Sequence, residues 1–481
     1  MRASMTLLAL LLPSMAVAAA PEPVAPAAPS PLSRAWQGVV AQSPEYAAAR
    51  ARREAGTASS SAARALWMPS LGAEGGFGRR SLDTTSTGAQ FSAPGFGVSN
   101  GVDFRTSVTD GNAHQWALVL QQPLLDAGRV ADAEGLRARG RMAEAQFRLA
   151  EQALMVRTAE ALAAVVEADA RFKAVHHQHE AAQRTRDQAQ ARYESGDIPV
   201  TDWREAQAQL DALEVAELDA RQGLAVATAA FTDLTGQPPP PANDIALTAP
   251  AAGIADATAA PTSEPAAEGT LSDWLHRAGE TSPALAVQVE MLSQARAELR
   301  RWSRLDGFRL SLVGQYGRES LDGRGDFGAA QMTNRVASIG LQASVPLFTG
   351  GLRAAQRRAA ESGERAAQAD LDAARQQVAL RTRTAWLEAS SARARVRAQH
   401  RAGNSALLRL DATRVGFESG DRTLLDLLSA ESGAMQAAAD SVRARCQGLV
   451  ATLRLAAAAG TLDAAALDAA GNGDFTCGRG D

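Results

Sequence analysis

The stretch QPLLDAG at residues 122–128 returns later in the chain as VPLFTGG at residues 345–351. A second pair of segments agrees as well. Residues 43–79 align without a gap with residues 282–318, and both segments carry Ser-Pro near the start and Gly-Arg at the end. Matching segments that recur in the same order are the signature of an internal duplication.

A third pair lies further along each copy, where YESGD at residues 193–197 matches FESGD at residues 417–421. The three pairs together predict two copies of one structural unit, at residues 32–237 and 270–460. Between them, residues 238–269 are rich in proline and alanine, a composition typical of a linker that runs over a surface.

Each copy contains long stretches without proline that are rich in good helix formers. The sequence predicts two helices in each stretch, separated by a tight turn at Gly196 in the first copy and at Gly420 in the second. The expected helices are 128–195, 201–234, 351–419 and 423–459. At 1.5 Å per residue the longest extend about 100 Å, and helices of this length need partner helices to bury their apolar stripes.

The N-terminus carries an export signal. Arg2 precedes an apolar run that begins at Met5, and small residues around Ala18 follow, as in a cleaved signal peptide. We expect residues 1–18 to be this peptide and residues 19–31 to be a Pro/Ala-rich N-terminal segment. Nowhere later does a run of about 18 apolar residues occur, so no transmembrane helix is predicted.

Four segments alternate apolar and polar residues with the period of a β-strand, as in Trp116, Leu118 and Leu120. The expected strands are 70–79, 114–123, 308–319 and 335–346. Such strands suit an ordinary half-buried antiparallel sheet or the lipid-facing wall of a membrane barrel. The signal peptide and the long helices favour the barrel. Four strands cannot close around a channel, so several subunits must share it.

The segments between the paired strands are rich in serine, threonine, glycine and asparagine. Residues 80–113 are therefore expected to form a long extracellular loop, with residues 321–334 as its shorter partner. After the last helix, residues 461–481 are expected to be a C-terminal tail.

The composition excludes several classes of function. Aromatic residues make up 5% of the chain although 46% is apolar, because alanine supplies much of the apolar count and favours closely packed helices. The net charge of −4 gives no support for a nucleic-acid partner. Without a phosphate loop or a convincing Ser/His/Asp spacing, we expect no enzymatic activity and no cofactor.

The cysteines and histidines leave two smaller questions. Cys446 and Cys477 are the only cysteines, and an exported chain permits either a disulfide between them or two free thiols. His176 and His179 lie three positions apart on an expected helix. This spacing can hold a metal, but without a nearby carboxylate or cysteine in the sequence a solvated helix face is favoured, and no metal site is predicted.

With these features the chain resembles the TolC family of outer-membrane channel proteins over roughly residues 32–465. The resemblance rests on the duplicated P-L-(L/F)-x-x-G, on the duplicated turns and on RTLLDLLSA at residues 422–430, which is similar to the tip segment of that family. It implies a mainly α-helical homotrimer in which four strands per subunit form a 12-strand β-barrel. A long α-helical coiled-coil tunnel then extends into the periplasm.

The resemblance also implies a function. Such a duct exports small molecules or proteins through the Gram-negative outer membrane, in contact with its lipid, by type I secretion or multidrug efflux. Its partners are a periplasmic adaptor (membrane fusion) protein and an inner-membrane ABC or RND-type transporter. The alternative is an exported structural or adhesive coiled-coil stalk that conducts nothing, although such a stalk has no use for the four amphipathic strands.

By the same resemblance, Asp202 and Arg422 correspond to positions of a polar latch that holds the periplasmic tip closed. Asp426 corresponds to a position whose copies ring the narrowest point of the pore. Ser429 stands where the family has a second ring aspartate, so this pore is expected to be less cation-selective. Phe417 stands where a latch residue carries a hydroxyl, and it cannot make that hydrogen bond.

A simpler role remains open for the same residues. Asp202 with Glu205, and Thr423 with Asp426, have the spacing of a helix capping box. A cap of this kind stabilises a helix by about 1 kcal/mol and would satisfy these side chains without any pore.

Overall fold

The computed structural model describes residues 30–95, 97–240, 269–303, 307–325 and 328–472. The expected signal peptide, most of the linker and Cys477 lie outside the described residues. In chain order the elements are α1 (Pro31–Gln42), α2 (Pro44–Ala65), β1 (Ser70–Ala93), β2 (Gly97–Asp126), α3 (Ala127–Glu194), α4 (Val200–Thr235), α5 (Leu271–Thr281), α6 (Pro283–Ser303), β3 (Arg309–Gly325), β4 (Gly328–Ser344), α7 (Leu352–Glu418), α8 (Leu424–Ala459) and α9 (Ala464–Asn472).

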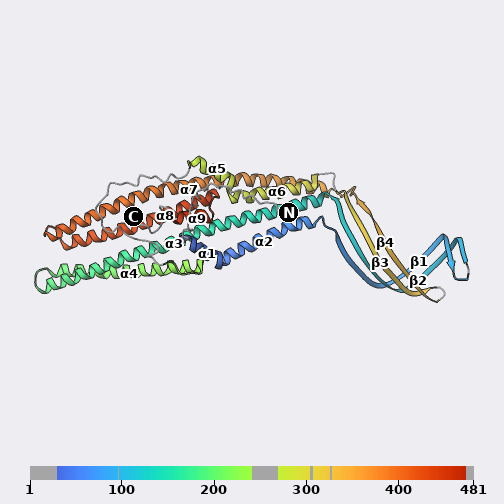
Figure 1. Ribbon diagram of the computed structural model, residues 1–481, viewed down its shortest axis with the longest axis horizontal. Helices are drawn as coiled ribbons and strands as arrows, with labels where there is room; N and C mark the ends of the chain where they lie inside the picture. The colour runs from blue at the N-terminus through green and yellow to red at the C-terminus, as the bar shows by residue number, and fades with distance from the viewer. Residues whose placement is uncertain (1–29, 96, 241–268, 304–306, 326–327, 473–481) are drawn as a thin grey trace, which may run out of the picture.

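The molecule is elongated, with the long helices at one end and the sheet at the other (Figure 1). The order of elements repeats, so that α1 to α4 with β1 and β2 correspond to α5 to α8 with β3 and β4. Capping residues and prolines mark where the helices begin. Ser43 accepts a hydrogen bond from Tyr46 N–H at 3.4 Å and is followed by Pro44, and Ser282-Pro283 stands at the equivalent start of α6.

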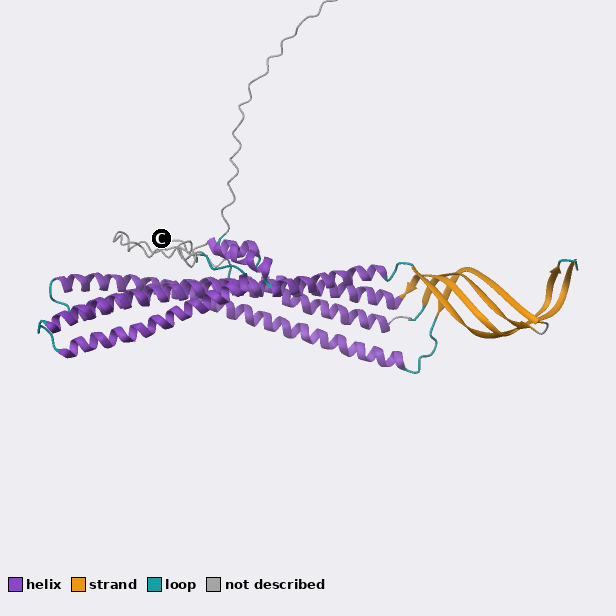
Figure 2. Ribbon diagram, turned by 90° about the horizontal axis from the view of Figure 1, so that it is seen from below, coloured by secondary structure: helices purple, strands orange, loops and turns teal. Residues whose placement is uncertain are grey.

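The long helices lie side by side and form a layer that runs along the molecule (Figure 2). In the half nearer the tips, α4 packs on α3, α3 on α8, and α8 on α7. In the half nearer the sheet, α2 packs on α3, α3 on α6, and α6 on α7. The 68 residues of α3 and the 67 of α7 therefore run the length of the layer, about 100 Å each.

The short helices gather near the middle of the long ones (Figure 1). The largest apolar core lies there, and its buried members include Trp36 of α1, Leu154 of α3, Leu453 of α8 and Leu467 of α9. Within the segment expected to be a tail, residues 464–472 form helix α9, because an alanine-rich stretch is a good helix former. Ser30 N–H and Oγ both donate to Asp468, at 3.0 and 2.8 Å. Cys446 is fully buried in the same core.

The four strands form one antiparallel sheet in the order β1-β2-β3-β4. The register places Leu71, Leu120 and Ile339 in the same row, and Trp116 meets Tyr316 edge to face at 5.8 Å on the same side. One side of the sheet is therefore apolar, and its residues are exposed, with Phe77 at 91% and Ile339 at 74%. Among the described helices, none has an apolar stretch that would let it cross a bilayer.

The strands are longer than the sequence predicts, and the expected loop at residues 80–113 is wrong. β1 and β2 stay paired from Ser70 opposite Gln121 to Ala93 opposite Gly97, so the segment is a β-hairpin. Residues 321–334 likewise belong largely to β3 and β4. The physical reason is that threonine is a good strand former, and a regular ladder satisfies the backbone of a polar segment as well as an apolar one.

The part of β2 that precedes Thr109 does not pair with β3, so there β1 and β2 continue alone as a two-stranded ribbon. Figure 1 shows this ribbon bending away at the end of the sheet. Phe91 and Phe104 meet across it at 6.0 Å between ring centres. The turn at its end holds Gly95 and Gly97, both with positive φ, which glycine adopts without strain.

Candidate functional site: the two tip turns

The turns from α3 into α4 and from α7 into α8 have the same backbone. Gly196 and Gly420 both adopt the left-handed conformation, with φ of 82° and 84°. Asp197 N–H donates to Arg192 O at 2.8 Å, and Asp421 N–H donates to Gly416 O at the same distance. These bonds close each long helix with a Schellman-type turn. Both turns lie at the end of the molecule farthest from the sheet (Figure 1).

The second turn starts α8 with a complete capping box. Thr423 N–H donates to Asp426 Oδ2 at 3.0 Å, and Asp426 N–H donates to Thr423 Oγ1 at 3.1 Å. The backbone and side-chain hydrogen bonds from Thr423, with a smaller contribution from the charge of Arg422, hold the pKa of the Asp426 carboxyl below its ordinary value. Asp426 is exposed, so its negative charge faces solvent in one subunit.

The first turn lacks such a box, so the alternative interpretation of Asp202 and Glu205 as a capping box is wrong. α4 begins at Val200, so the cap is Pro199, which has no N–H to donate and makes no side-chain cap hydrogen bond. Asp202 is therefore the third residue of α4, as Asp426 is the third residue of α8. The two aspartates occupy equivalent positions of the two repeats.

Within one subunit, the described contacts do not join Asp202 to Arg422. Asp202 accepts a hydrogen bond from its neighbour Thr201 at 3.1 Å, and Arg422 N–H donates to Gly416 O at 3.1 Å. Figure 1 shows that the two hairpins end apart from each other. Asp202 and Arg422, the expected latch residues, are both exposed, so a contact between them requires a second subunit or a change in the tip.

The remaining expected tip residues are also at the surface. Phe417 is 37% exposed in the last turn of α7. Ser429 is exposed on α8, and its backbone carbonyl accepts a hydrogen bond from Arg409 at 3.3 Å. The place equivalent to Phe417 in the first repeat holds Tyr193, which stacks on Trp203 with 5.9 Å between ring centres. Arg204 lies over the Trp203 ring at 4.4 Å. Sequence reasoning missed this aromatic stack.

Further up the first hairpin, the structure brings a carboxylate to the histidines. Glu217 of α4 lies 3.0 Å from His176 Nδ1 and 3.1 Å from His179 Nδ1, and Arg221 donates to it at 3.1 Å. Glu217 could not be predicted as a partner from the sequence, because it lies 38 positions after His179, beyond a turn. Among the described residues, no group of three or more histidines, cysteines or acidic side chains is arranged to hold a metal.

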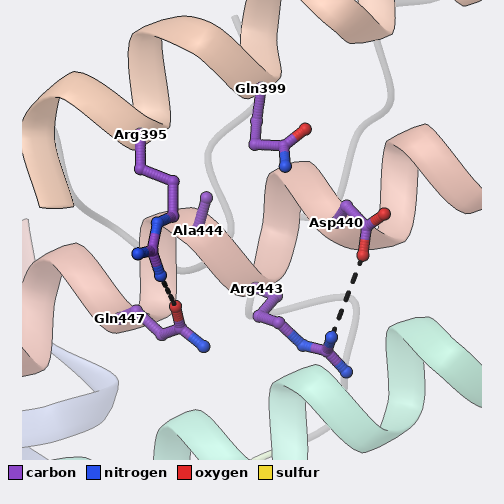
Figure 3. Close-up of a pocket in the computed structure, with 6 residues that line it drawn as sticks. All are labelled: Arg395, Gln399, Asp440, Arg443, Ala444 and Gln447. Atoms are coloured by element: carbon purple, nitrogen blue, oxygen red, sulfur yellow. Dashed lines mark hydrogen bonds and ion pairs between the residues drawn. The ribbon is translucent and has the colours of Figure 1, made fainter.

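A shallow cavity of about 380 Å³ lies between α7 and α8. Figure 3 shows Arg395 reaching from α7 to Gln447, while Arg443 turns toward Asp440. Arg443 also lies 3.7 Å from Glu167 of α3. These polar groups already have partners, so this surface does not form a second candidate site.

The sequence matches the family model described as outer membrane efflux protein, over residues 36–237 and 274–461. The chain belongs to the outer membrane efflux protein family. The two matched stretches each contain one copy of the duplicated unit, and the resemblance to TolC channels is confirmed. Members of this outer membrane efflux family lie in the outer membrane and extend into the periplasm, and so does this chain.

Two relatives align over most of their length. The chain is 28% identical to the alkaline protease secretion protein AprF of Pseudomonas aeruginosa, covering 88% of this chain and 83% of AprF. It is 26% identical to the proteases secretion protein PrtF of Dickeya chrysanthemi, covering 89% of this chain and 88% of PrtF. Among solved structures, a membrane protein from Pseudomonas aeruginosa matches with a TM-score of 0.66 at 19% identity, covering 92% of this chain and 99% of that one. This last likeness establishes the efflux-protein fold.

Proposed function

We propose that three copies of this chain assemble into an outer-membrane export duct for proteins. Their sheets join into a 12-strand barrel, and their helices form a tunnel that ends at the two tip turns. The observation that carries the proposal is the sheet itself. It has four strands, one exposed apolar side, and outer edges at β1 and β4 that pair with no other described strand. Open edges are not tolerated in lipid, so further copies are needed to close the sheet.

The helical layer supports assembly in the same way. In the half nearer the tips its edges are α7 and α4. On α7, large apolar side chains recur at multiples of seven residues and remain exposed: Leu380 at 60%, Leu387 at 54%, Leu408 at 63% and Val415 at 60%. On α4, Val215, Leu218 and Val226 are 58–62% exposed. A seven-residue apolar repeat is the pattern of a helix that packs against another helix.

The charges at these edges are complementary. Residues 375–401 of α7 contain seven arginines and one acidic residue, whereas α4 contains seven acidic residues and two arginines. The α7 edge of one copy therefore suits the α4 edge of the next. Contacts of this head-to-tail kind close into a ring when the rotation between copies is right, and three copies give the 12 strands of the barrel.

The secretion role draws on the relatives. AprF and PrtF are both named for protease secretion, and the chain covers more than four-fifths of each. We therefore favour type I secretion over multidrug efflux. The energy for transport then comes from an inner-membrane ABC transporter, joined to the duct by a periplasmic adaptor protein, and the duct itself performs no chemistry.

Conductance in planar lipid bilayers tests the proposal. Purified full-length protein should insert in discrete steps of equal conductance, and chemical cross-linking of the same preparation should give a trimer. A coiled-coil stalk would give cross-linked oligomers without conductance, and that result would overturn the duct. The proteins secreted by a strain that lacks the chain are compared with those secreted after its gene is restored. A difference in secreted protein indicates a protein substrate rather than small molecules.

The orientation has its own test. The ribbon of β1 and β2 is expected outside the cell and the tip turns in the periplasm. An epitope tag inserted at Gly95, in the turn of that ribbon, should bind antibody on intact cells. A tag at the exposed Gly196 serves as the control and should bind only after the outer membrane is opened. The opposite pattern would reverse the orientation.

A further inference from the structure

The ring of His176 lies between two carboxylates that come from two helices. Its Nδ1 is 3.0 Å from Glu217 Oε1 on α4, and its Nε2 is 3.3 Å from Glu180 Oε1 on α3. Phe172 stacks against the ring, with 5.7 Å between ring centres and 20° between the planes. Both edges and one face of the imidazole are thus fixed by neighbours.

This arrangement suits one protonation state. A neutral imidazole carries one N–H, so it can donate to only one of the two carboxylates and must point a lone pair at the other. An imidazolium carries two N–H groups and donates to both. Hydrogen bonds between charged groups are also stronger than neutral ones. With a proton on both ring nitrogens, His176 can therefore donate to Glu217 and to Glu180 at the same time.

Other charged and titratable groups surround the ring on both helices. On α3, Glu180 also lies 3.6 Å from His177, and His179 faces the second oxygen of Glu217 at 3.1 Å. On α4, Arg221 lies 3.1 Å from Glu217. Burial of Glu217 opposes its ionisation, but the hydrogen bond from His176 and the nearby positive charges prevail and lower the pKa of its carboxyl. Glu217 is thus a stable anionic partner.

We propose that His176 is a proton-binding clasp between α3 and α4, which donates to Glu217 of α4 and to Glu180 of α3 at the same time only while the imidazole is charged. The clasp lies about 20 residues before the tip turn, which corresponds to roughly 30 Å along the helix. Losing the proton removes one hydrogen bond across the helix pair or within α3. The hairpin below the clasp then opens more easily, so the mobility of the first tip depends on the pH of the periplasm.

The sign of the pH dependence follows from the two kinds of group. A contact that needs a charged imidazole is favoured by acid and is weakened as pH rises, because the ring then releases its proton. At the acidic end, Glu217 has a lowered pKa, so its contribution is lost only as pH falls below the ordinary glutamate range.

Hydrogen exchange of the full-length protein, followed segment by segment, tests the clasp. Wild type and His176→Gln are compared at the same pH, so that the intrinsic pH dependence of exchange cancels. Near pH 5.5 the variant should lose protection in residues 172–221 by roughly threefold to tenfold, and near pH 8.5 the two should agree. His400→Gln, at an exposed position of α7, is the matched control and should follow wild type throughout.

A second variant distinguishes an effect of the bound proton from an effect of side-chain packing. Glu180→Gln leaves the ring in place but removes one of its two carboxylates, so its difference from wild type should also fade as pH rises. A loss of protection in His176→Gln that is equal at both pH values would overturn the clasp, because it would mean that the ring acts by packing. No loss at either pH would overturn it as well.

Discussion

The two tip turns share a backbone and differ in their side chains. Each closes a long helix with a left-handed glycine, Gly196 or Gly420, and the same pattern of main-chain hydrogen bonds. The first turn then enters α4 through Pro199 without a side-chain cap, and Tyr193 stacks on Trp203 beside it. The second turn enters α8 through a complete capping box and carries Arg422.

This difference distinguishes the turn geometry, which comes from the duplication, from the side chains, which can serve the function. The turn geometry is common to both repeats, so it serves the fold of a long helical hairpin. The side chains are not common, so they are available for different tasks. The first tip is held by stacked rings, and the second presents an arginine and an aspartate at the start of its helix. We therefore expect variants of the turn glycines to act alike in the two repeats, and side-chain variants to act differently.

The largest effect is expected for the double variant Arg422→Ser with Asp202→Ala. If these residues pair between neighbouring hairpins of a trimer, each exposed pair is worth about 0.2–1 kcal/mol. Three pairs then shift the balance between closed and open tips by roughly threefold to a hundredfold. Single-channel conductance or open probability in planar bilayers should rise accordingly.

Asp211→Ala on α4 is the control for the double variant, since it removes an exposed acidic residue of the same helix away from the tip. Unchanged conductance in the double variant, together with a lower melting temperature, would assign both residues to helix stability. The side chains of the second tip would then have a structural role, as the turn backbone does, and not a functional one.

The next effect is expected at the turn glycines. An alanine at Gly196 or Gly420 would meet no atom within 4 Å, so any cost comes from the backbone alone. The left-handed conformation costs a residue with a Cβ about 1–2 kcal/mol. Both variants should reduce the hydrogen-exchange protection of their own turn to a similar degree, and unequal losses would show that the two turns are not equivalent.

A smaller effect is expected from the caps. Thr423→Ala removes the hydroxyl of the capping box and should destabilise the start of α8 by about 1 kcal/mol. Pro199→Ala is the matched variant of the first repeat, and it removes no side-chain cap. Protection of the first turn of α8 should fall in the first variant, while that of α4 changes less in the second. Equal losses would contradict the assigned caps.

The sequence predicted the duplication, the long helices and the sheet, because each rests on a periodicity or on repeated segments. The prediction from sequence failed where a polar composition is compatible with both a loop and a strand, as in the threonine-rich β1–β2 ribbon. It also placed the start of α4 one residue late, at residue 201, whereas the helix begins at Val200 with Pro199 as its cap. The partners of His176 could not be predicted, since Glu217 reaches it only when α4 folds back along α3.

The smallest effect is expected at the pore ring. Asp426→Asn should lower the preference of the channel for cations and its block by multivalent cations, because three negative charges disappear from the narrowest point of the proposed trimer. The change in the permeability ratio should stay below about threefold, because exposed charges are screened within about 8 Å at physiological salt. Ser429→Asp, one turn along α8, should change selectivity in the opposite direction, and Asp202→Asn is the matched control on the first repeat.

The pH dependence of selectivity sharpens this last test. Hydrogen bonds from Thr423 hold the pKa of Asp426 below its ordinary value, so the ring keeps its charge until pH falls below the usual aspartate range. Wild-type cation selectivity should therefore persist on acidification and fall only at that lower pH, and Thr423→Ala should move the fall to higher pH. Asp426→Asn should lack this step. If Asp202→Asn alters selectivity as much as Asp426→Asn does, both repeats contribute equally to the ring, and the division of tasks between the two tips is wrong.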